Sequence, residues 1–226
     1  MADVMDWDSA YRGGGEFEGE PPWNIGEPQP ELAALWRAGK FRSEVLDAGC
    51  GHAELSLALA ADGYTVTGID ISPTAVAAAT TAAAAERGVA ERTTFVAADI
   101  TELAGFEDRF ATVVDSTLFH SLPVQSRDSY LQAVHRAAAP GAGFFVLVFA
   151  TGAFPPGMEG GPNVVTEDEL RETVSRYWTV DDIRPAAIHS TMAVAGMPGM
   201  AMPPAELLDD KGRLRMKAFL LSAHKD

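Results

Sequence analysis

LDAGCGHAEL, residues 46–55, is the stretch that decides the fold, because it places two glycines between an apolar segment and a helix-like one. Gly49 and Gly51 follow the acidic Asp47, and glycines at a strand-to-helix turn permit a tight turn and a close approach of the backbone to a ligand. A dinucleotide fingerprint requires Gly or Ala where this chain has Glu54, and a carboxylate at that helix start repels a pyrophosphate. The turn therefore predicts a site for a ligand without phosphates and disfavours an NAD-dependent reductase.

Strand-like and helix-like segments alternate on both sides of this turn. Apolar and β-branched runs predict strands over residues 43–49, 64–72, 93–100, 111–118, 143–151, 178–185 and 216–225. Helical patterns cover residues 30–39, 53–63, 74–88, 126–141 and 166–177, and the pair Pro140–Gly141 is expected to end the helix before it. This alternation predicts an α/β fold with a doubly wound, seven-stranded, mostly parallel sheet, in a single domain over residues 1–226.

The charge and composition of the chain limit the classes of partner. The formal net charge is −15 at pH 7 without a run of Lys or Arg, so a nucleic-acid backbone or an anionic membrane would repel the protein. The first residues lack the pattern of a signal peptide, no apolar stretch is long enough to span a bilayer, and the single cysteine, Cys50, allows no internal disulfide. These observations predict a cytoplasmic protein that binds neither nucleic acid nor membrane and holds no metal.

Residues 45–72, VLDAGCGHAELSLALAADGYTVTGIDIS, resemble the first two motifs of the class I S-adenosylmethionine-dependent methyltransferases. The resemblance implies a Rossmann-like fold in which the glycine loop lies against the methionine portion of the cofactor and its acidic neighbour faces the cofactor's amino group. It also implies that the acid ending the second strand holds the ribose hydroxyls. The residues expected to bind the cofactor here are Asp47, Gly49, Gly51, Asp70 and Ile71.

Further motifs follow in the family's order. Asp99 and Ile100 end the third predicted strand, where the resemblance implies a contact with the adenine of the cofactor. Asp115 ends the fourth strand and is expected either to contact the cofactor or to serve as a structural turn residue. PGAGFF, residues 140–145, resembles the family's turn before the fifth strand, and Ala53 stands in place of the third glycine of the glycine loop.

His120 lies directly beyond the fourth predicted strand, on the side of the sheet where the resemblance places methyl transfer. A base is needed only when the pKa of the accepting group lies well above the working pH. We expect His120 to act as a catalytic base or as a contact for the methyl acceptor, with Phe119 as a second acceptor contact. The alternative is a packed histidine that shapes the pocket without moving a proton.

The N-terminal segment WDSAYRGGGEFEGEPPWNIGEPQPEL, residues 7–32, is rich in Trp, Gly and Pro. It resembles the cap that closes over the cofactor in thiol, halide and thiopurine methyltransferases. The resemblance implies an N-terminal cap and first helix over residues 1–42. Its expected contacts are Trp23 and Gly26 with the cofactor and Trp7 and Tyr11 with the acceptor. The alternative is that these aromatic side chains only pack on the surface.

A methionine-rich segment, residues 190–206, forms the last feature of the chain that bears on function. Its Gly and Pro residues predict a loop, and flexible, polarizable methionines can fit flat aromatic ligands of varied outline. We expect Met192, Met197 and Met200 to contact the acceptor. The alternative is a hydrophobic loop that fills the core or joins two subunits.

The cap, the segment DSTLFHSL at residues 115–122 and the methionine-rich loop together resemble the mycobacterial methyltransferases that inactivate heterocyclic toxins. This resemblance implies a cofactor-binding half over residues 43–150 and a substrate-side half over 151–226. It predicts methyl transfer from S-adenosyl-L-methionine to a hydroxyl or ring nitrogen of a small heterocycle, such as a hydroxyquinolone or a quinone-derived phenol, in detoxification. S-adenosyl-L-homocysteine would be the product, and the protein a monomer or homodimer. The alternatives are a thiol, halide or thiopurine S-methyltransferase and a non-catalytic cofactor-binding module.

Overall fold

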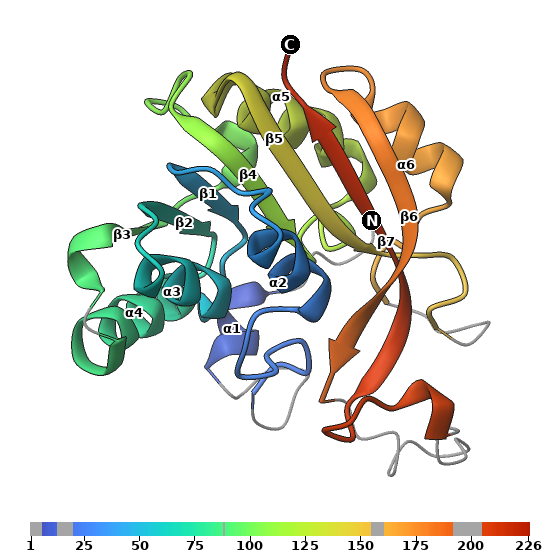
Figure 1. The fold of residues 1–226 in the computed structure, drawn as a ribbon, viewed down its shortest axis with the longest axis horizontal. Coiled ribbons are helices and arrows are strands. Elements are labelled where there is room, and N and C mark those ends of the chain that lie inside the picture. The colour runs from blue at the N-terminus through green and yellow to red at the C-terminus, as the bar shows by residue number, and fades with distance from the viewer. Residues whose placement is uncertain (1–5, 13–19, 88, 155–160, 192–204) are drawn as a thin grey trace.

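The computed structural model of the chain describes residues 6–12, 20–87, 89–154, 161–191 and 205–226. One seven-stranded sheet runs in the order β3-β2-β1-β4-β5-β7-β6. Strand β7 is antiparallel to both of its neighbours, and the other pairs are parallel. The predicted doubly wound, mostly parallel sheet is confirmed (Figure 1). The strands are β1 (Val45–Ala48), β2 (Val66–Asp70), β3 (Thr93–Ala97), β4 (Phe110–Ser116), β5 (Ala138–Phe149), β6 (Thr179–Ser190) and β7 (Leu214–His224).

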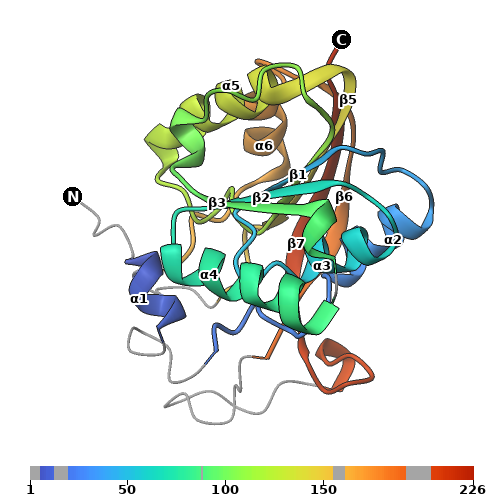
Figure 2. The ribbon, with the colours of Figure 1, turned by 90° about the vertical axis from the view of Figure 1, so that its left-hand side faces the viewer.

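Helices cover both faces of the sheet (Figure 2). Helices α2, α3 and α4 lie on one face, and α5 and α6 lie on the other, while the short α1 lies beside α4. Ser72 and Pro73 begin α4 as predicted, since the Ser72 side chain accepts a hydrogen bond from the Ala75 N–H. The helices are α1 (Trp7–Tyr11), α2 (Pro30–Arg37), α3 (Glu54–Ala61), α4 (Pro73–Ala82), α5 (Arg127–Ala137) and α6 (Glu167–Val174).

The central strands are buried on both faces, which explains why their sequences are mostly apolar. In β4, Val113 packs into the cluster beneath α5 and α6, whereas Val114 packs into the cluster beneath α2 and α3. In β5, Val146 and Leu147 alternate between the same two clusters. This two-sided core holds β1, β4 and β5 rigidly, so their carboxyl ends provide a fixed platform.

The Pro140–Gly141 pair was expected to end a helix, and this prediction is wrong. Helix α5 already ends at Ala137, and β5 begins at Ala138, before the pair. The pairing of β5 with β4 shifts register in this region, and Gly141 adopts the left-handed φ of +72° that the irregularity requires. The pair therefore forms a bulge inside the strand rather than a helix terminus.

The strand order reverses between β1 and β4, which lie side by side at the centre of the sheet. In open α/β sheets, ligands bind beyond the carboxyl ends of the strands at such a reversal. Within the described ranges no helix is both long and apolar enough to cross a membrane.

Candidate active site

The glycine loop after β1 is shaped by two close contacts. Gly49 and Gly51 have left-handed φ angles of +70° and +52°. A Cβ on Gly49 would lie 3.0 Å from the Leu118 Cβ, and one on Gly51 would lie 2.6 Å from the Tyr11 hydroxyl. The loop therefore needs glycine both for its backbone conformation and for the side chains that cover it. Ala53, at the position of the family's third glycine, also adopts a left-handed φ of 64°.

Asp70, at the end of β2, is buried directly beneath this loop. One carboxylate oxygen accepts from the Gly51 N–H at 2.9 Å and the other from the Ser72 N–H at 2.9 Å. Burial raises the pKa of Asp70. The next residue, Ile71, is 55% exposed, which is unusual for a large apolar side chain in this structure. A buried acid beside an exposed apolar side chain suits a nucleoside, whose ribose donates hydrogen bonds and whose base has an apolar face.

Asp47, in β1, is the second buried acid below the glycine loop. Its Oδ2 accepts from the Ser56 hydroxyl of α3 at 2.7 Å. Burial raises the pKa of Asp47 to about 6, and the nearby Asp70 acts in the same direction. A buried carboxylate that lacks a cationic partner among the described residues gains stabilisation from a positively charged ligand group.

Helix α1 is docked onto the main domain through its first turn. The Asp8 carboxylate accepts from the Ser72 hydroxyl at 2.7 Å and the Thr74 N–H at 2.9 Å, at the start of α4. The Thr74 N–H, followed by the Ser72 hydroxyl, holds the pKa of Asp8 well below its usual range. The docking places Tyr11, at the end of α1, directly over Gly51.

The aromatic residues of the cap lie together over the glycine loop. The Tyr11 ring is 5.1 Å from the His52 ring, and the Trp23 indole N–H donates to the Tyr11 hydroxyl at 3.4 Å. The rings of Trp7 and Trp23 meet edge to face at 5.8 Å. Burial, with Asp70 nearby, raises the pKa of Tyr11. The structure thus brings Trp7, Tyr11 and Trp23 together, and it places Tyr11 over Gly51 of the glycine loop.

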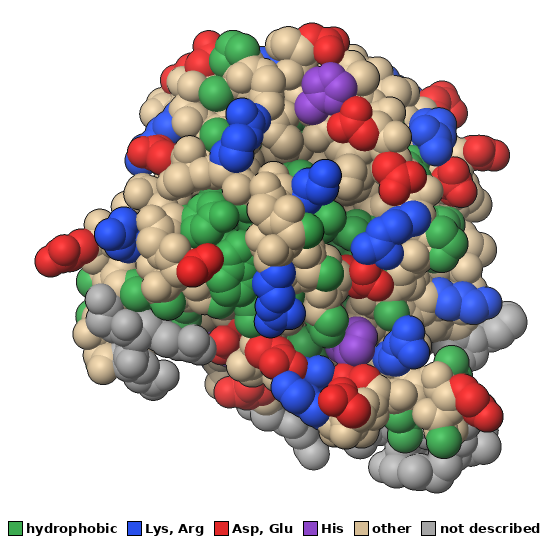
Figure 3. Space-filling model, viewed as in Figure 1, with side chains coloured by type: hydrophobic (Ala, Val, Ile, Leu, Met, Phe, Trp, Pro, Cys, Tyr) green, Lys and Arg blue, Asp and Glu red, His purple; other side chains and the backbone are tan. Residues whose placement is uncertain are grey.

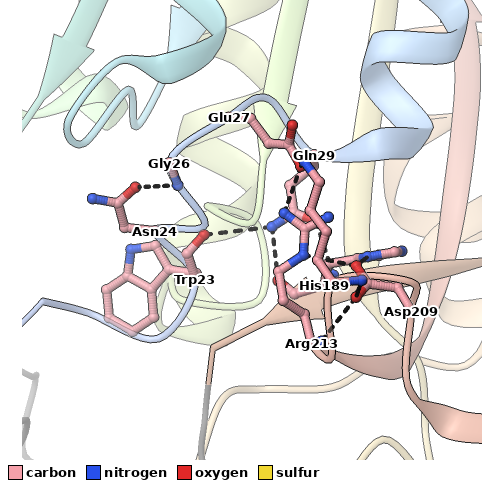
Figure 4. Close-up of polar contacts among 9 residues, drawn as sticks. Trp23, Asn24, Gly26, Glu27, Gln29, His189, Asp209 and Arg213 are labelled. Atoms are coloured by element: carbon pink, nitrogen blue, oxygen red, sulfur yellow. Dashed lines mark hydrogen bonds and ion pairs between the residues drawn. The ribbon is translucent and has the colours of Figure 1, made fainter.

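Gly26, the fourth cap residue, lies in a turn of the segment that leads to α2. Its N–H donates to the Asn24 side-chain carbonyl at 3.2 Å, and its φ is +69° (Figure 4). The Asn24 amide nitrogen in turn lies 2.7 Å from His52 Nδ1, next to Gly51 in the glycine loop. Asn24 and Asp8 anchor the cap, and sequence reasoning missed both because their partners lie far along the chain.

Asp99 and Ile100 follow β3 at the same edge of the sheet. The Ala98 N–H donates to the Asp70 backbone carbonyl at 3.0 Å, so Asp99 lies close to the end of β2. The exposed Asp99 carboxylate accepts from the Thr101 N–H at 2.8 Å and from its hydroxyl at 2.7 Å. Ile100 is buried in the core beneath α5. Asp99 is therefore the one of the two whose side chain faces solvent.

Asp115, at the end of β4, has the contacts of a turn residue, the second of its two predicted roles. It is 0% exposed; one oxygen accepts from the Leu118 N–H at 2.8 Å and the Phe119 N–H at 3.2 Å. The other oxygen accepts from the Tyr130 hydroxyl at 2.7 Å. Burial raises the pKa of Asp115 to about 7.

Phe119, a predicted acceptor contact, is fully buried in the core against Tyr130, so its ring has no surface to offer an acceptor.

His120 is buried with its ring 4.4 Å from the ring of Phe149. Its Nδ1 accepts from the Phe149 N–H at 3.1 Å, so the ring proton lies on Nε2. Burial and then the charge of Arg127 lower the pKa of His120 to about 3. A neutral imidazole with an occupied Nδ1 can donate a hydrogen bond from Nε2 but is a weak base at neutral pH.

Two further aromatic residues at the end of β5 complete this part of the site. Phe149 meets Phe154 edge to face at 4.9 Å, and Phe149 also contacts His120. Leu118, two residues before His120 in the chain, packs against Gly49 of the glycine loop. The sequence analysis did not single out Phe149, although an aromatic residue at the end of the fifth predicted strand could have identified it as a site residue. The predicted acceptor contacts Met192, Met197 and Met200 lie outside the described residues.

Comparison with known proteins identifies the family. The methyltransferase domain family matches residues 45–141. A 2-heptyl-1-hydroxyquinolin-4(1H)-one methyltransferase of Mycobacteroides abscessus is 48% identical over 223 residues, which cover 97% of this chain and 96% of that protein. The chain belongs to the class I S-adenosylmethionine-dependent methyltransferases. The prediction of a methyltransferase enzyme is confirmed.

Solved structures show the same fold along almost the whole of this methyltransferase. One, from work on the conversion of a disulfide bond into a thioacetal group during echinomycin biosynthesis, is 33% identical with a TM-score of 0.81 and covers 99% of this chain and 92% of that chain. The 1,6-didemethyltoxoflavin-N1-methyltransferase of Burkholderia thailandensis is 23% identical with a TM-score of 0.62, over 96% of this chain and 84% of that chain. The likeness to the second structure concerns the fold alone.

Proposed function

We propose that this methyltransferase transfers the methyl group of S-adenosyl-L-methionine to a hydroxyl, or a ring nitrogen, of a small aromatic heterocycle of the hydroxyquinolone type. The observation that carries this proposal is the 48% identity, over nearly the full length of both chains, to a methyltransferase named for a hydroxyquinolone. The aromatic group of His120, Phe149 and Phe154, at the carboxyl ends of β4 and β5, supports it, because flat heterocycles pack favourably on such rings.

The residues in and around the glycine loop suit the adenosine, the amino group and the methionine chain of the cofactor. Asp70 and Ile71 would hold the adenosine, with the exposed Asp99 available to the adenine amine. Asp47 would face the amino group, and the glycine-loop backbone would lie along the methionine chain. Tyr11, Trp23 and Gly26 would close the site from the cap. When bound, the cofactor supplies an electrophilic methyl group on a sulfonium.

The chain's own contribution to transfer is alignment and the exclusion of water. The cap covers the glycine loop, and the Nε2–H of His120 would donate to the acceptor atom and orient it toward the glycine loop. With His120 neutral, the acceptor would need to be acidic enough to lose its proton to solvent. Trp7 and the three methionines would contact the remainder of the acceptor.

A sulfur acceptor is the second candidate, favoured by the 33% identical structure from work on the chemistry of a disulfide bond. Incubation of the purified protein with S-adenosyl-L-methionine and either 2-heptyl-1-hydroxyquinolin-4(1H)-one or an aromatic thiol separates the two. We expect mass spectrometry to find the methylated quinolone and equimolar S-adenosyl-L-homocysteine, with much slower methylation of the thiol. Preference for the thiol would replace the first candidate by the second, and methylation of neither would contradict both.

The His120→Ala variant should lower kcat/KM for the hydroxyquinolone about tenfold to a hundredfold, because one hydrogen bond to a developing or full charge contributes about 1.5–3 kcal/mol. The pH dependence should not change, since a histidine with a pKa of about 3 does not titrate in the working range. Steady-state rates between pH 5 and pH 9 measure both effects. His224→Ala, at the far end of β7, is the matched control and should leave the rate unchanged. An acid limb near pH 6 that disappears in His120→Ala would instead identify His120 as a base.

Affinity for S-adenosyl-L-homocysteine should fall about fivefold to tenfold between pH 7 and pH 5. The pKa of Asp47 is about 6 in the free protein, and the cofactor's ammonium group would lower it by favouring the carboxylate. Protonation of Asp47 in the free protein then competes with binding, so affinity falls by up to about tenfold for each pH unit below that pKa. Calorimetric titrations at several pH values measure the slope. Asp47→Asn should bind more weakly with little pH dependence, whereas Asp62→Asn, an exposed acid at the end of α3, should match the wild type.

A further inference from the structure

The segment that leads to α2, residues 22–29, is bonded to the end of β6 at the edge of the sheet by the side chain of Gln29 and by the Pro22 carbonyl, which accepts from the Thr191 N–H. Gln29 is only 5% exposed, and its amide pairs with the backbone of His189 at the end of β6. Its Nε2 donates to the His189 carbonyl at 2.9 Å, and its Oε1 accepts from the His189 N–H at 2.9 Å (Figure 4). The amide thus occupies the place of a peptide group of a neighbouring strand, on an edge that would otherwise expose unpaired backbone groups.

Ion pairs join the same segment to the start of β7. Glu27 accepts from Arg213 and from Lys211, each at 2.6 Å, and the Arg213 Nε donates to Asp209 at 2.7 Å. Asp209 also lies 2.7 Å from the His189 ring. Charged side chains of both signs and a histidine gather over this end of β6 and β7 in the space-filling view (Figure 3). These contacts therefore link the end of β6 to the start of β7, and link both to residues 27–29.

The other end of the segment contacts the glycine loop. Asn24 lies 2.7 Å from His52, and Trp23 donates to Tyr11 above Gly51. The Gln29 Nε2 also donates to the Trp23 backbone carbonyl at 3.4 Å, so one amide group contacts both the cap and β6. A continuous set of contacts therefore leads from the glycine loop, through residues 23–29, to the end of β6 and the start of β7.

We propose that Gln29 is a positioning residue that couples occupation of the glycine loop to the order of the ends of β6 and β7, on the acceptor side of the molecule. The inference rests on the proposed function, because it takes the glycine loop as the cofactor site. A ligand beneath Tyr11 and beside His52 restricts the cap, and the buried Gln29 amide passes this restriction to His189. An acceptor that binds afterwards meets a framework that is already ordered, which raises its affinity.

Hydrogen exchange with and without S-adenosyl-L-homocysteine tests the coupling without an acceptor. The reporters are the amides of Thr191, which donates to the Pro22 carbonyl, and of Lys211 and Arg213, which donate to Asp209. In the wild type, the ligand should slow their exchange at least fivefold. In Gln29→Ala the slowing should fall below twofold, although calorimetry should find ligand affinity within threefold of the wild type.

Glu31→Ala is the matched control for this experiment. Glu31 also joins the N-terminal region to β6, through Arg184 at 2.7 Å and the Ala187 N–H at 3.4 Å, but among the described residues its carboxylate makes no hydrogen bond to Trp23 or to the glycine loop. This variant should retain the full ligand-dependent slowing. Slowing that is absent in the wild type although the ligand binds, or that persists in Gln29→Ala, would overturn the coupling and leave the proposed function standing. Failure of the ligand to bind the wild type would overturn both.

Affinity for 2-heptyl-1-hydroxyquinolin-4(1H)-one, measured with and without S-adenosyl-L-homocysteine, provides a second readout. We expect bound S-adenosyl-L-homocysteine to raise this affinity at least fivefold in the wild type and in Glu31→Ala, and less than twofold in Gln29→Ala. Equal enhancement in Gln29→Ala would contradict the coupling. If the quinolone does not bind but the ligand-dependent slowing is intact, the coupling is supported and the proposed acceptor is wrong.

Discussion

Replacing Asp70 with alanine is expected to weaken the binding of S-adenosyl-L-homocysteine at least a hundredfold. The carboxylate receives the N–H groups of Gly51 and Ser72, and it is the buried acid that the ribose hydroxyls of the cofactor would meet. The variant would lose the charge-assisted hydrogen bonds to the two ribose hydroxyls, and each such bond contributes about 1.5–3 kcal/mol to binding. The sum corresponds to about a hundredfold or more in affinity.

Calorimetric titration measures this affinity, and thermal unfolding separates it from a loss of fold. Asp70→Asn should be intermediate, because an amide keeps one oxygen for one of the two backbone donors but turns its NH₂ group toward the other. Asp62→Asn removes an acid from the end of α3 and should bind like the wild type. Unchanged affinity in a folded Asp70→Ala variant would show that the cofactor binds away from the end of β2.

Asp115→Ala is expected to lower the free energy of unfolding by about 3–5 kcal/mol, because it leaves buried polar groups without partners. The groups that lose their acceptor are the N–H groups of Leu118 and Phe119 and the hydroxyl of Tyr130. Chemical denaturation followed by tryptophan fluorescence measures the loss. The protein that remains folded at low temperature should bind S-adenosyl-L-homocysteine within threefold of the wild type, since Asp115 serves the turn after β4.

Tyr130→Phe is the milder companion variant, which keeps the test informative if Asp115→Ala does not fold. It removes one of the three donors and should cost about 1–1.5 kcal/mol, with no change in ligand affinity. A stable Asp115→Ala variant that loses cofactor affinity would restore the other interpretation of this residue, namely a direct cofactor contact.

The sheet and the glycine loop could be predicted from the sequence because their signals are local. Alternating segments define the strands and helices, and Gly49 and Gly51 need glycine for a φ that few other residues adopt. The bulge at Pro140–Gly141 could not be predicted in this way. A proline followed by a glycine ends a helix in most contexts, and only the pairing of β5 with β4 places the same pair inside a strand.

The roles of individual side chains in the site depended on more distant contacts. His120 has the sequence environment of a base, yet its Nδ1 accepts from Phe149, 29 residues later, and burial keeps the ring neutral. The sequence leaves two interpretations of Asp115 open, and the contacts of its oxygens with the turn and with Tyr130 support the structural one. The protonation state and the free lone pairs of a group are set by its neighbours in space, which the spacing of residues along the chain does not specify.

The sequence by itself determined the α/β class, the strand-to-helix turn that contains Gly49 and Gly51, and the acids at the ends of the first two strands. These follow from periodicity and backbone conformation, which act over a few residues. Only the tertiary structure decided that Tyr11 covers Gly51, that Asp8 accepts from the start of α4 and that Gln29 pairs with His189, 160 residues away. Such contacts form when packing brings distant segments together, because their free energy comes from burial and hydrogen bonds that exist only in the folded chain.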